Sequence, residues 1–232
     1  MVIEFVVPSL PSRTGSFTVP CGPGDLSVTA WVVGESHGFG PPATREAAES
    51  TVDMVRRLHA TTPPPGLVPW RPVVTKTFPA QLALRLGMPW DKGPYGERAR
   101  AAIADRIEQV GRWATAYLRL VDAAASRSWV ATHGEPHQGN QLVTDTGRVL
   151  VDWETVRRAP AERDLKVLVE GGFADVCEAT GGFDQEMVEM FDLEWRLDEI
   201  SQYADWFAAP HAGTKDDEIA YGGLLGELER PG

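Results

Sequence analysis

The polar residues best suited to chemistry gather in two short segments, THGEPHQGN at 132–140 and VDWE at 151–154. Between them the sequence predicts two strands joined by the turn DTG, which would fold the chain back on itself. Asn140 and Asp152 are therefore expected to reach the same ion, and their amide and carboxylate oxygens suit a hard cation such as Mg²⁺. Glu135 is placed to orient the proton of an attacking hydroxyl. These are the parts that phosphoryl transfer needs, since it depends mainly on positioning and charge neutralisation.

Other chemistries that use histidine and glutamate fit this stretch less well. His133 and His137 have the i, i+4 spacing of zinc ligands, but Pro136 interrupts a helix and the glutamate is not in the H-E-x-x-H position. The H-x-E of zinc deaminases also occurs, but the P-C-x-x-C that must accompany it is absent. A loop of satisfied polar groups is the plain alternative for H-G-E-P-H alone. The register with Asn140 and Asp152 argues against it.

The spacing of these residues matches that of kinase catalytic loops. In protein kinases H-R-D-x-x-x-x-N supplies the base and one metal ligand, and a downstream aspartate supplies the other. Here His133-x-Glu135-x-x-x-x-Asn140 keeps that spacing, with glutamate where aspartate is usual, and Asp152 follows at the end of the second predicted strand.

At these residues the sequence resembles the aminoglycoside phosphotransferase family of the protein-kinase-like superfamily. That family's loop reads H-G-D-x-H-x-x-N and is followed by a hairpin and D-W. His137, the pair Asp152-Trp153 and the segment APAERDL at 159–165 carry the resemblance. The resemblance extends over residues 1–228 and is specific around 133–165.

The resemblance implies a role for each matching position. Asn140 and Asp152 would hold Mg²⁺ together with the ATP or GTP that donates the phosphoryl group, while His137 and Asp164 would brace the loop. The catalytic set would comprise four residues: Glu135 as the carboxylate, His133 as the histidine that packs the loop, and Asn140 and Asp152 as the metal ligands. Acidic and aromatic residues of the C-terminal helices would be candidates for the substrate wall, namely Asp192, Glu194, Trp195, Asp198 and Glu199.

Two features depart from the family pattern. Glu135 replaces an aspartate, and the extra methylene moves the carboxylate outward. The chain also has no G-x-G-x-x-G, and its first lysine is Lys76, downstream of the predicted linker. The phosphate-gripping first part of the N-lobe is thus expected to be missing. This leaves a second hypothesis open: a catalytically impaired kinase-like module that binds a small molecule or a partner protein.

The remaining elements must position this loop, and their order, β first and α last, predicts an α+β, protein-kinase-like fold. We expect residual N-lobe strands in 1–33, a hinge or linker at 34–43, and a mainly helical C-lobe with the catalytic hairpin in 44–232. Strand patterns occur at 2–7, 16–19, 26–33, 129–132, 141–144 and 148–153. Helical patterns occur at 44–60, 80–86, 97–125, 162–170, 184–207 and 216–228.

Composition narrows the class of partner. The chain has 232 residues, 43% of them hydrophobic, and a net charge of −11, which disfavours nucleic acid and anionic membranes and leaves a small-molecule substrate. Two distant cysteines and the absence of a signal peptide or apolar span favour the cytoplasm. A shortened N-lobe would also expose a strand edge and apolar surface, so a homodimer is a further expectation.

Overall fold

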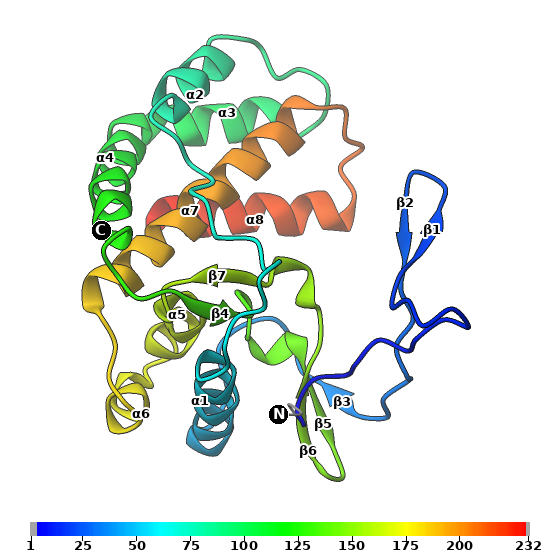
Figure 1. Cartoon of the computed structure of the whole chain (residues 1–232). Helices are drawn as coiled ribbons and strands as arrows, with labels where there is room; N and C mark the ends of the chain where they lie inside the picture. Colours follow the sequence, from blue (N-terminus) through cyan, green and yellow to red (C-terminus); the bar gives the residue numbers. More distant parts are fainter. Residues whose placement is uncertain (1–3, 231–232) are drawn as a thin grey trace. The chain divides into compact units, whose positions relative to one another are not determined.

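The computed structural model describes residues 4–230 (Figure 1). The chain divides into two compact units, and residues 44–232 contribute to both of them. The predicted boundaries between the N-lobe, the linker and the C-lobe remain a prediction. Each unit is built from two separate stretches of the chain, 1–70 with 128–184 in the first unit and 71–127 with 185–232 in the second.

The first unit contains a three-stranded antiparallel sheet. Its hairpin consists of β5 (Gln141–Thr144) and β6 (Gly147–Leu150), with Gln141 opposite Leu150. Gly147 has φ +133° in the turn, a conformation that favours glycine. The hydroxyl of Thr144 donates to the Gly147 carbonyl at 2.9 Å and closes the turn. On the other edge of β5 lies β3 (Glu35–Ser36), so part of the predicted linker is itself a strand.

Two smaller antiparallel pairs complete the strands. The predicted strand at 129–132 is present as β4 (Val130–Thr132), which pairs with β7 (Arg157–Ala159). In the N-terminal part, β1 (Val19–Cys21) pairs with β2 (Gly24–Leu26) across a turn in which Gly22 has φ +61°.

The N-terminal strands are shorter than the sequence predicts. The strand expected at 26–33 is wrong beyond Leu26, because the next residues pair elsewhere: Val28 accepts from the amide of Leu10 at 2.7 Å, and Thr29 bridges to Ser9. The strand expected at 2–7 lies partly outside the described residues. Within them, Val6 makes only an isolated bridge, to Leu150.

Three helices pack around the sheets of the first unit: α1 (Arg45–His59), α5 (Glu162–Glu170) and α6 (Ala174–Ala179). The first begins at Thr44, whose side chain accepts from the amide of Ala47 at 3.2 Å and caps the helix. The buried apolar residues that join them are Ala48, Val52, Val55, Leu165, Leu168, Val176 and Cys177. The sequence predicts the bounds of α5 and misses α6, which has only six residues.

The second unit is entirely helical among its described residues. The single helix predicted at 97–125 is wrong, because the chain breaks at Arg106, whose φ is −113° and ψ 7°. The break lets α3 (Gly96–Asp105) pack on α7 (Gln185–Ala208) and α8 (Lys215–Glu229), while α4 (Ile107–Ala124) runs along α7 (Figure 1). Its elements are α2 (Phe78–Leu86), α3 (Gly96–Asp105), α4 (Ile107–Ala124), α7 (Gln185–Ala208) and α8 (Lys215–Glu229).

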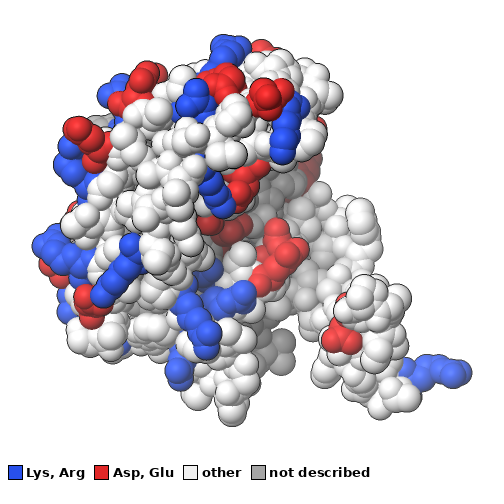
Figure 2. All heavy atoms as spheres, turned by 90° about the horizontal axis from the view of Figure 1, so that it is seen from above, with Lys and Arg blue, Asp and Glu red and all other residues white. Residues whose placement is uncertain are grey.

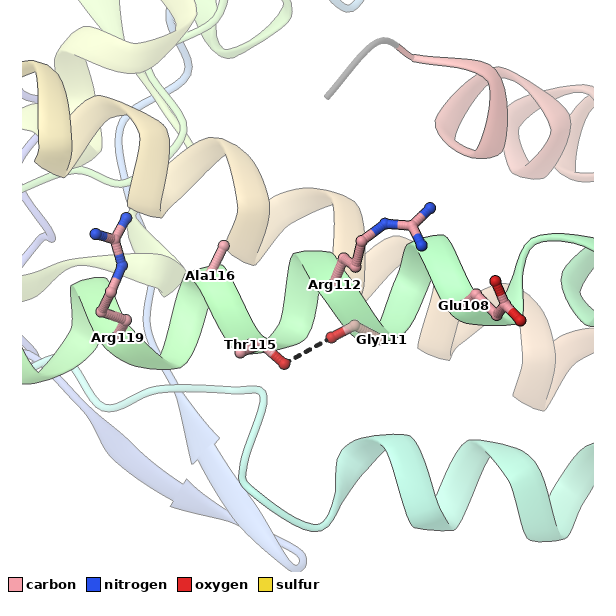
Figure 3. Close-up of a pocket in the computed structure, with 6 residues that line it drawn as sticks. All are labelled: Glu108, Gly111, Arg112, Thr115, Ala116 and Arg119. Atoms are coloured by element: carbon pink, nitrogen blue, oxygen red, sulfur yellow. Dashed lines mark hydrogen bonds between the residues drawn. The ribbon is translucent and has the colours of Figure 1, made fainter.

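A shallow groove runs along the surface of α4 (Figure 3). Its residues are a helical stripe in which the Thr115 hydroxyl donates to the Gly111 carbonyl at 2.9 Å. The stripe comprises Glu108, Gly111, Arg112, Thr115, Ala116 and Arg119. Because one helix supplies every lining residue, we assign it no function. Across the described residues, no helix combines the length and the apolar character that crossing a membrane requires.

Candidate active site

His133 connects the catalytic loop to the strand that ends before Asp152. Its side chain is fully buried at the end of β4. Nε2 lies 2.9 Å from the Val151 carbonyl, which only accepts, so this nitrogen carries the proton, while Nδ1 accepts from the Glu135 amide at 3.3 Å. The Trp153 ring meets the imidazole at 4.6 Å between centroids. Burial lowers the pKa of His133, which favours this neutral, doubly bonded ring.

Asp164 holds the loop from beneath. This fully buried carboxylate accepts from the amides of His133 at 3.1 Å and Gly134 at 2.6 Å, and from Nε2 of His59 at 2.9 Å. Burial alone would raise its pKa, but these donors outweigh burial and hold the pKa below the usual aspartate value. His59 was not among the predicted site residues. It is the last residue of α1, and nothing in the sequence pattern there indicates a contact with Asp164.

Glu135 lies half-buried at the tip of the loop. Burial, and then the negative charge of Asp152, raise the pKa of its carboxyl, while the Arg163 guanidinium opposes the rise. The two carboxylates are therefore close enough to repel each other. A carboxyl in this environment is more basic than one in water, which suits a group that accepts a proton.

Asn140 and Asp152 are brought side by side by the hairpin. The carbonyl of Asn140 accepts from the Val151 amide at 2.9 Å, which sets Asn140 against the residue before Asp152. The Nδ2 group of Asn140 donates to the Glu135 carbonyl at 3.0 Å, so its Oδ1 is the atom left to face a cation. Asn140 thus contacts both segments: its side chain bonds to the loop at Glu135, and its backbone bonds to Val151, next to Asp152.

Asp152 has a strained backbone. Its φ of 63° and ψ of 67° are left-handed, and among residues 4–230 it alone has positive φ without being glycine. Such a conformation costs about 1–3 kcal/mol and persists where the surroundings impose it, often at functional sites. Here the strain turns the aspartate out of the strand and leaves its side chain exposed.

The donor set suits Mg²⁺ shared with a nucleotide. Asn140 and Asp152 offer hard oxygen atoms, and Mg²⁺ is commonly held by one or two protein groups plus substrate phosphates. Two protein ligands leave most positions around such an ion to phosphate oxygens and water. No cluster of three or more histidine, cysteine or acidic side chains with metal-site geometry occurs in the described part of the chain.

His137 lies at the start of the short 3₁₀ helix η1 (Gln138–Asn140). Its ring packs on Phe39 at 4.6 Å between centroids, and its Nδ1 is buried without a hydrogen-bond partner among residues 4–230. Burial, followed by the neighbouring His133, lowers its pKa, so the ring is neutral at physiological pH. The structure places it against the hinge segment that contains Phe39.

Gln141 is a site residue that sequence reasoning missed. This buried side chain donates from Nε2 to the Pro136 carbonyl at 2.8 Å and to the Thr51 hydroxyl at 3.0 Å. Thr51 in turn donates to the Ala47 carbonyl of α1 at 2.8 Å. The catalytic loop is thereby fixed to a helix. A polar residue at an inward-facing position of β5 was the available signal.

A cavity of about 390 Å³ is lined in part by Leu142 and Val151, which lie within two positions of the candidate metal ligands in the sequence. The segment 29–36 supplies most of the other lining residues, and Val7 supplies one more. Gly34 allows the segment to approach β5, because a Cβ there would lie 2.9 Å from the Val143 carbonyl. The volume and the apolar lining suit a planar ring system. The residues that line this cavity were not among the predicted site residues.

The five substrate-wall candidates lie in the second unit, on α7. Glu194 is 8% exposed and accepts from the Tyr117 hydroxyl at 3.0 Å and the Val73 amide at 3.2 Å. Asp192 bonds to Arg196 and Arg230. The other three candidates are half-exposed, namely Trp195, Asp198 and Glu199. Their role as a substrate wall stays a prediction.

Charged side chains are mixed on the surface. Figure 2 shows lysine and arginine interspersed with aspartate and glutamate over the face drawn, with uncharged surface between them. The net charge of −11 is thus not gathered into a single patch on that face.

Comparison with known proteins places these features in a family context. Residues 23–206 match the model of a family described as the phosphotransferase enzyme family. Protein StrN of Streptomyces griseus is 27% identical over 244 residues, an alignment that takes in 99% of this chain and 67% of StrN.

Solved structures with the same fold include two kinds of kinase. Spectinomycin phosphotransferase APH(9)-Ia, in complex with ADP and spectinomycin, has a TM-score of 0.76 at 13% identity, covering 99% of this chain and 75% of that one. A choline/ethanolamine kinase family protein from Mesorhizobium loti has a TM-score of 0.53 at 20% identity, covering 92% and 74%. These neighbours confirm the predicted α+β, protein-kinase-like fold.

Proposed function

The chain belongs to the phosphotransferase enzyme family, and on that basis we propose that it transfers the terminal phosphoryl group of ATP or GTP to a hydroxyl of a small molecule. The observation that carries the proposal is the convergence of Glu135, Asn140 and Asp152. Asn140 touches the Glu135 backbone and pairs with the residue before Asp152. Three oxygen-bearing residues from two segments are thus linked through neighbouring backbone groups.

In the proposed reaction Glu135 accepts the proton of the substrate hydroxyl. The hydroxyl oxygen attacks the γ-phosphorus, the bond to the β,γ-bridging oxygen breaks, and the nucleoside diphosphate leaves. Burial and the charge of Asp152 raise the pKa of Glu135, which makes it a better proton acceptor than a solvated carboxylate. The raised pKa supports Glu135 as the base despite its extra methylene.

Asn140 and Asp152 would hold Mg²⁺ through Oδ1 and the carboxylate. When bound, the ion supplies positive charge that neutralises the phosphate oxygens. The left-handed backbone of Asp152 turns its side chain out of the strand, where the carboxylate is open to an arriving metal–nucleotide. His133, which bonds to the Val151 carbonyl, keeps that segment in register with the loop.

The base of the nucleotide would occupy the cavity lined by residues 29–36, Leu142 and Val151. Leu142 follows Asn140 by two positions and Val151 directly precedes Asp152. A base held there would direct its phosphates toward both candidate ligands. This geometry supports a nucleotide donor.

The substrate is proposed by class. APH(9)-Ia binds spectinomycin in its structure, and a choline/ethanolamine kinase family protein shares the fold. We therefore propose an aminated or sugar-like metabolite or antibiotic as the acceptor, used in the cytoplasm. The expected homodimer is supported by apolar residues exposed on one face of the β1–β2 hairpin, namely Phe17, Val19, Leu26 and Val28.

A screen for product tests the proposal. The protein is incubated with Mg²⁺-ATP and a panel of hydroxylated amines, aminocyclitols and sugars, and phosphorylated product is detected by mass spectrometry. We expect product from the wild type and from Asp145→Asn, which changes an exposed acid in the hairpin turn. Glu135→Gln is expected to form none. Equal product from Glu135→Gln would contradict the assignment.

A second candidate is a kinase-like module that binds without turnover. The observation behind it is that residues 1–75 contain neither G-x-G-x-x-G nor a lysine. This alternative predicts that the panel yields no product while some compounds still raise the melting temperature. Product formation would exclude it.

A further inference from the structure

A single guanidinium nitrogen lies beneath the catalytic loop and joins its two sides. Arg163 is the second residue of α5, and its Nη1 donates to the Thr132 hydroxyl at 3.1 Å and to the Thr155 carbonyl at 2.9 Å. Thr132 ends β4 and directly precedes His133. Thr155 ends the 3₁₀ helix η2 (Trp153–Thr155), which begins immediately after Asp152. The nitrogen therefore links the strand entering the loop to the segment leaving Asp152.

A second bond closes the link. The Thr155 hydroxyl donates to the His133 carbonyl at 2.8 Å, so Thr155 is bound to the loop through both its side chain and, by way of Arg163, its backbone. The Thr132 hydroxyl donates to the Arg157 carbonyl at 3.0 Å and is thereby oriented to accept from Arg163. These contacts lie in a part-buried environment, where hydrogen bonds that involve a charged donor are stronger than on the surface.

The loop is shaped around this arginine. Gly134 has φ +104°, and a Cβ at that position would overlap the Arg163 guanidinium. The glycine thus serves two needs at once: the left-handed backbone and the space for the side chain below. The amide of the same glycine donates to Asp164, so neighbouring residues of α5 hold the loop by different atoms.

The two acidic side chains of the proposed site need such a link. Glu135 and Asp152 come from separate segments, and each carries a negative charge that repels the other. Asp152 also has an unfavourable backbone, which relaxes unless its neighbours hold it. A cation bonded to both segments opposes their separation. Asp164, an anion bonded only to the loop and His59, does not supply this link.

We propose that Arg163 is a positioning residue that sets Glu135 against Asp152 by holding Thr132 and Thr155 together. The inference rests on the proposed phosphotransfer for its kinetic consequence, and on the structure alone for the link. Displacement of catalytic groups by about 1 Å can cost on the order of 10²-fold in rate. Loss of the arginine should therefore lower kcat more than it weakens nucleotide binding, because Asp152 is displaced rather than removed and the cavity contributes to nucleotide binding separately.

The test compares Arg163→Met, Arg163→Lys and a matched control, Arg158→Met. Arg158 is an exposed arginine on β7, and its guanidinium makes no hydrogen bond or ion pair with other described residues. Lysine can rebuild the link because a single nitrogen, Nη1, bonds to both the Thr132 hydroxyl and the Thr155 carbonyl. Two measurements are made on each full-length variant: amide hydrogen exchange by mass spectrometry, and steady-state kinetics with the acceptor found in the screen.

We expect Arg163→Met to speed exchange in residues 132–136 and 153–156 together, leaving α1 and the second unit at wild-type rates. Its kcat should fall on the order of 10- to 100-fold, with KM for the nucleotide within about threefold of wild type. Arg163→Lys should recover most of both losses, and Arg158→Met should match the wild type.

Two results would overturn the proposal. One is wild-type exchange in both segments of Arg163→Met, which would show that no link was lost. The other is faster exchange spread evenly over the first unit, with kcat per folded molecule unchanged, which would make Arg163 a general stabilising residue. If the wild type itself forms no product, the proposed function fails, and the exchange data still decide whether the link exists.

Discussion

Replacement of Asp164 by asparagine should destabilise the protein strongly, although the two side chains have nearly the same shape. In the native protein the carboxylate is fully buried and accepts from three donors: the amides of His133 and Gly134 and Nε2 of His59. Asparagine keeps one accepting oxygen. Its Nδ2 group would point at a donor, so at least one buried donor loses its partner.

The cost follows from the bonds that are lost. A hydrogen bond to a charged group contributes about 1.5–3 kcal/mol, and a buried donor left unsatisfied costs about 1–3 kcal/mol. We expect Asp164→Asn to lower the free energy of unfolding by about 3–4 kcal/mol, near the range of about 3–5 kcal/mol known for broken buried pairs. Because the pKa of Asp164 lies below the ordinary aspartate value, its stabilisation is complete above that value and is lost as pH falls through the native pKa.

Urea unfolding at pH 7 and at pH 3, followed by tryptophan fluorescence, measures both effects. Asp145→Asn in the exposed hairpin turn is the matched control and should stay within about 0.5 kcal/mol of wild type. The difference between wild type and Asp164→Asn should shrink at the lower pH. A loss below about 1 kcal/mol at pH 7 would refute the view that this carboxylate braces the loop.

Three further predictions concern the site itself. The pH profile of kcat/KM, which reports the free enzyme, should rise with pH through a pKa above the ordinary glutamate value of 4.5, because burial and Asp152 raise the pKa of Glu135. A rise at or below that value would contradict the assignment. Asp152→Gly should raise the free energy of unfolding by about 1 kcal/mol in thermal denaturation, since glycine tolerates the left-handed backbone, while weakening nucleotide binding at least about tenfold. A destabilised glycine variant would show that the backbone is not strained. Gln141→Leu should lower the free energy of unfolding by about 1–3 kcal/mol in urea, because the buried Pro136 carbonyl loses its donor. An unchanged urea midpoint would show that Gln141 does not stabilise the loop.

The sequence predicted the family, the fold and the elements around the site well. The identification of a kinase-like phosphotransferase rested on the residues of 133–165 and is confirmed by the family match over residues 23–206. Helix α5 and the hairpin strands followed from local signals, namely apolar periodicity and the turn DTG. Spacing alone placed Asn140 opposite the end of β6.

What the sequence could not predict depends on contacts between distant segments. His59 meets Asp164 across 105 positions, and Gln141 meets Thr51 across 90, and no periodicity reports such pairs. The break at Arg106 also escaped prediction, because the apolar pattern continues through it while packing on α7 and α8 turns the chain. The left-handed backbone of Asp152 is likewise imposed by its surroundings.

The central claim is that Asn140 and Asp152 form a metal–nucleotide site beside Glu135. Calorimetric titration of Mg²⁺-ATP into the wild type, Asp152→Ala and Asp145→Asn tests it most directly. We predict binding to the wild type and the Asp145→Asn control, and a loss of at least about tenfold in affinity, equivalent to about 1.4 kcal/mol, for Asp152→Ala. Equal affinity in all three proteins, or no binding to the wild type at millimolar nucleotide, would contradict the account.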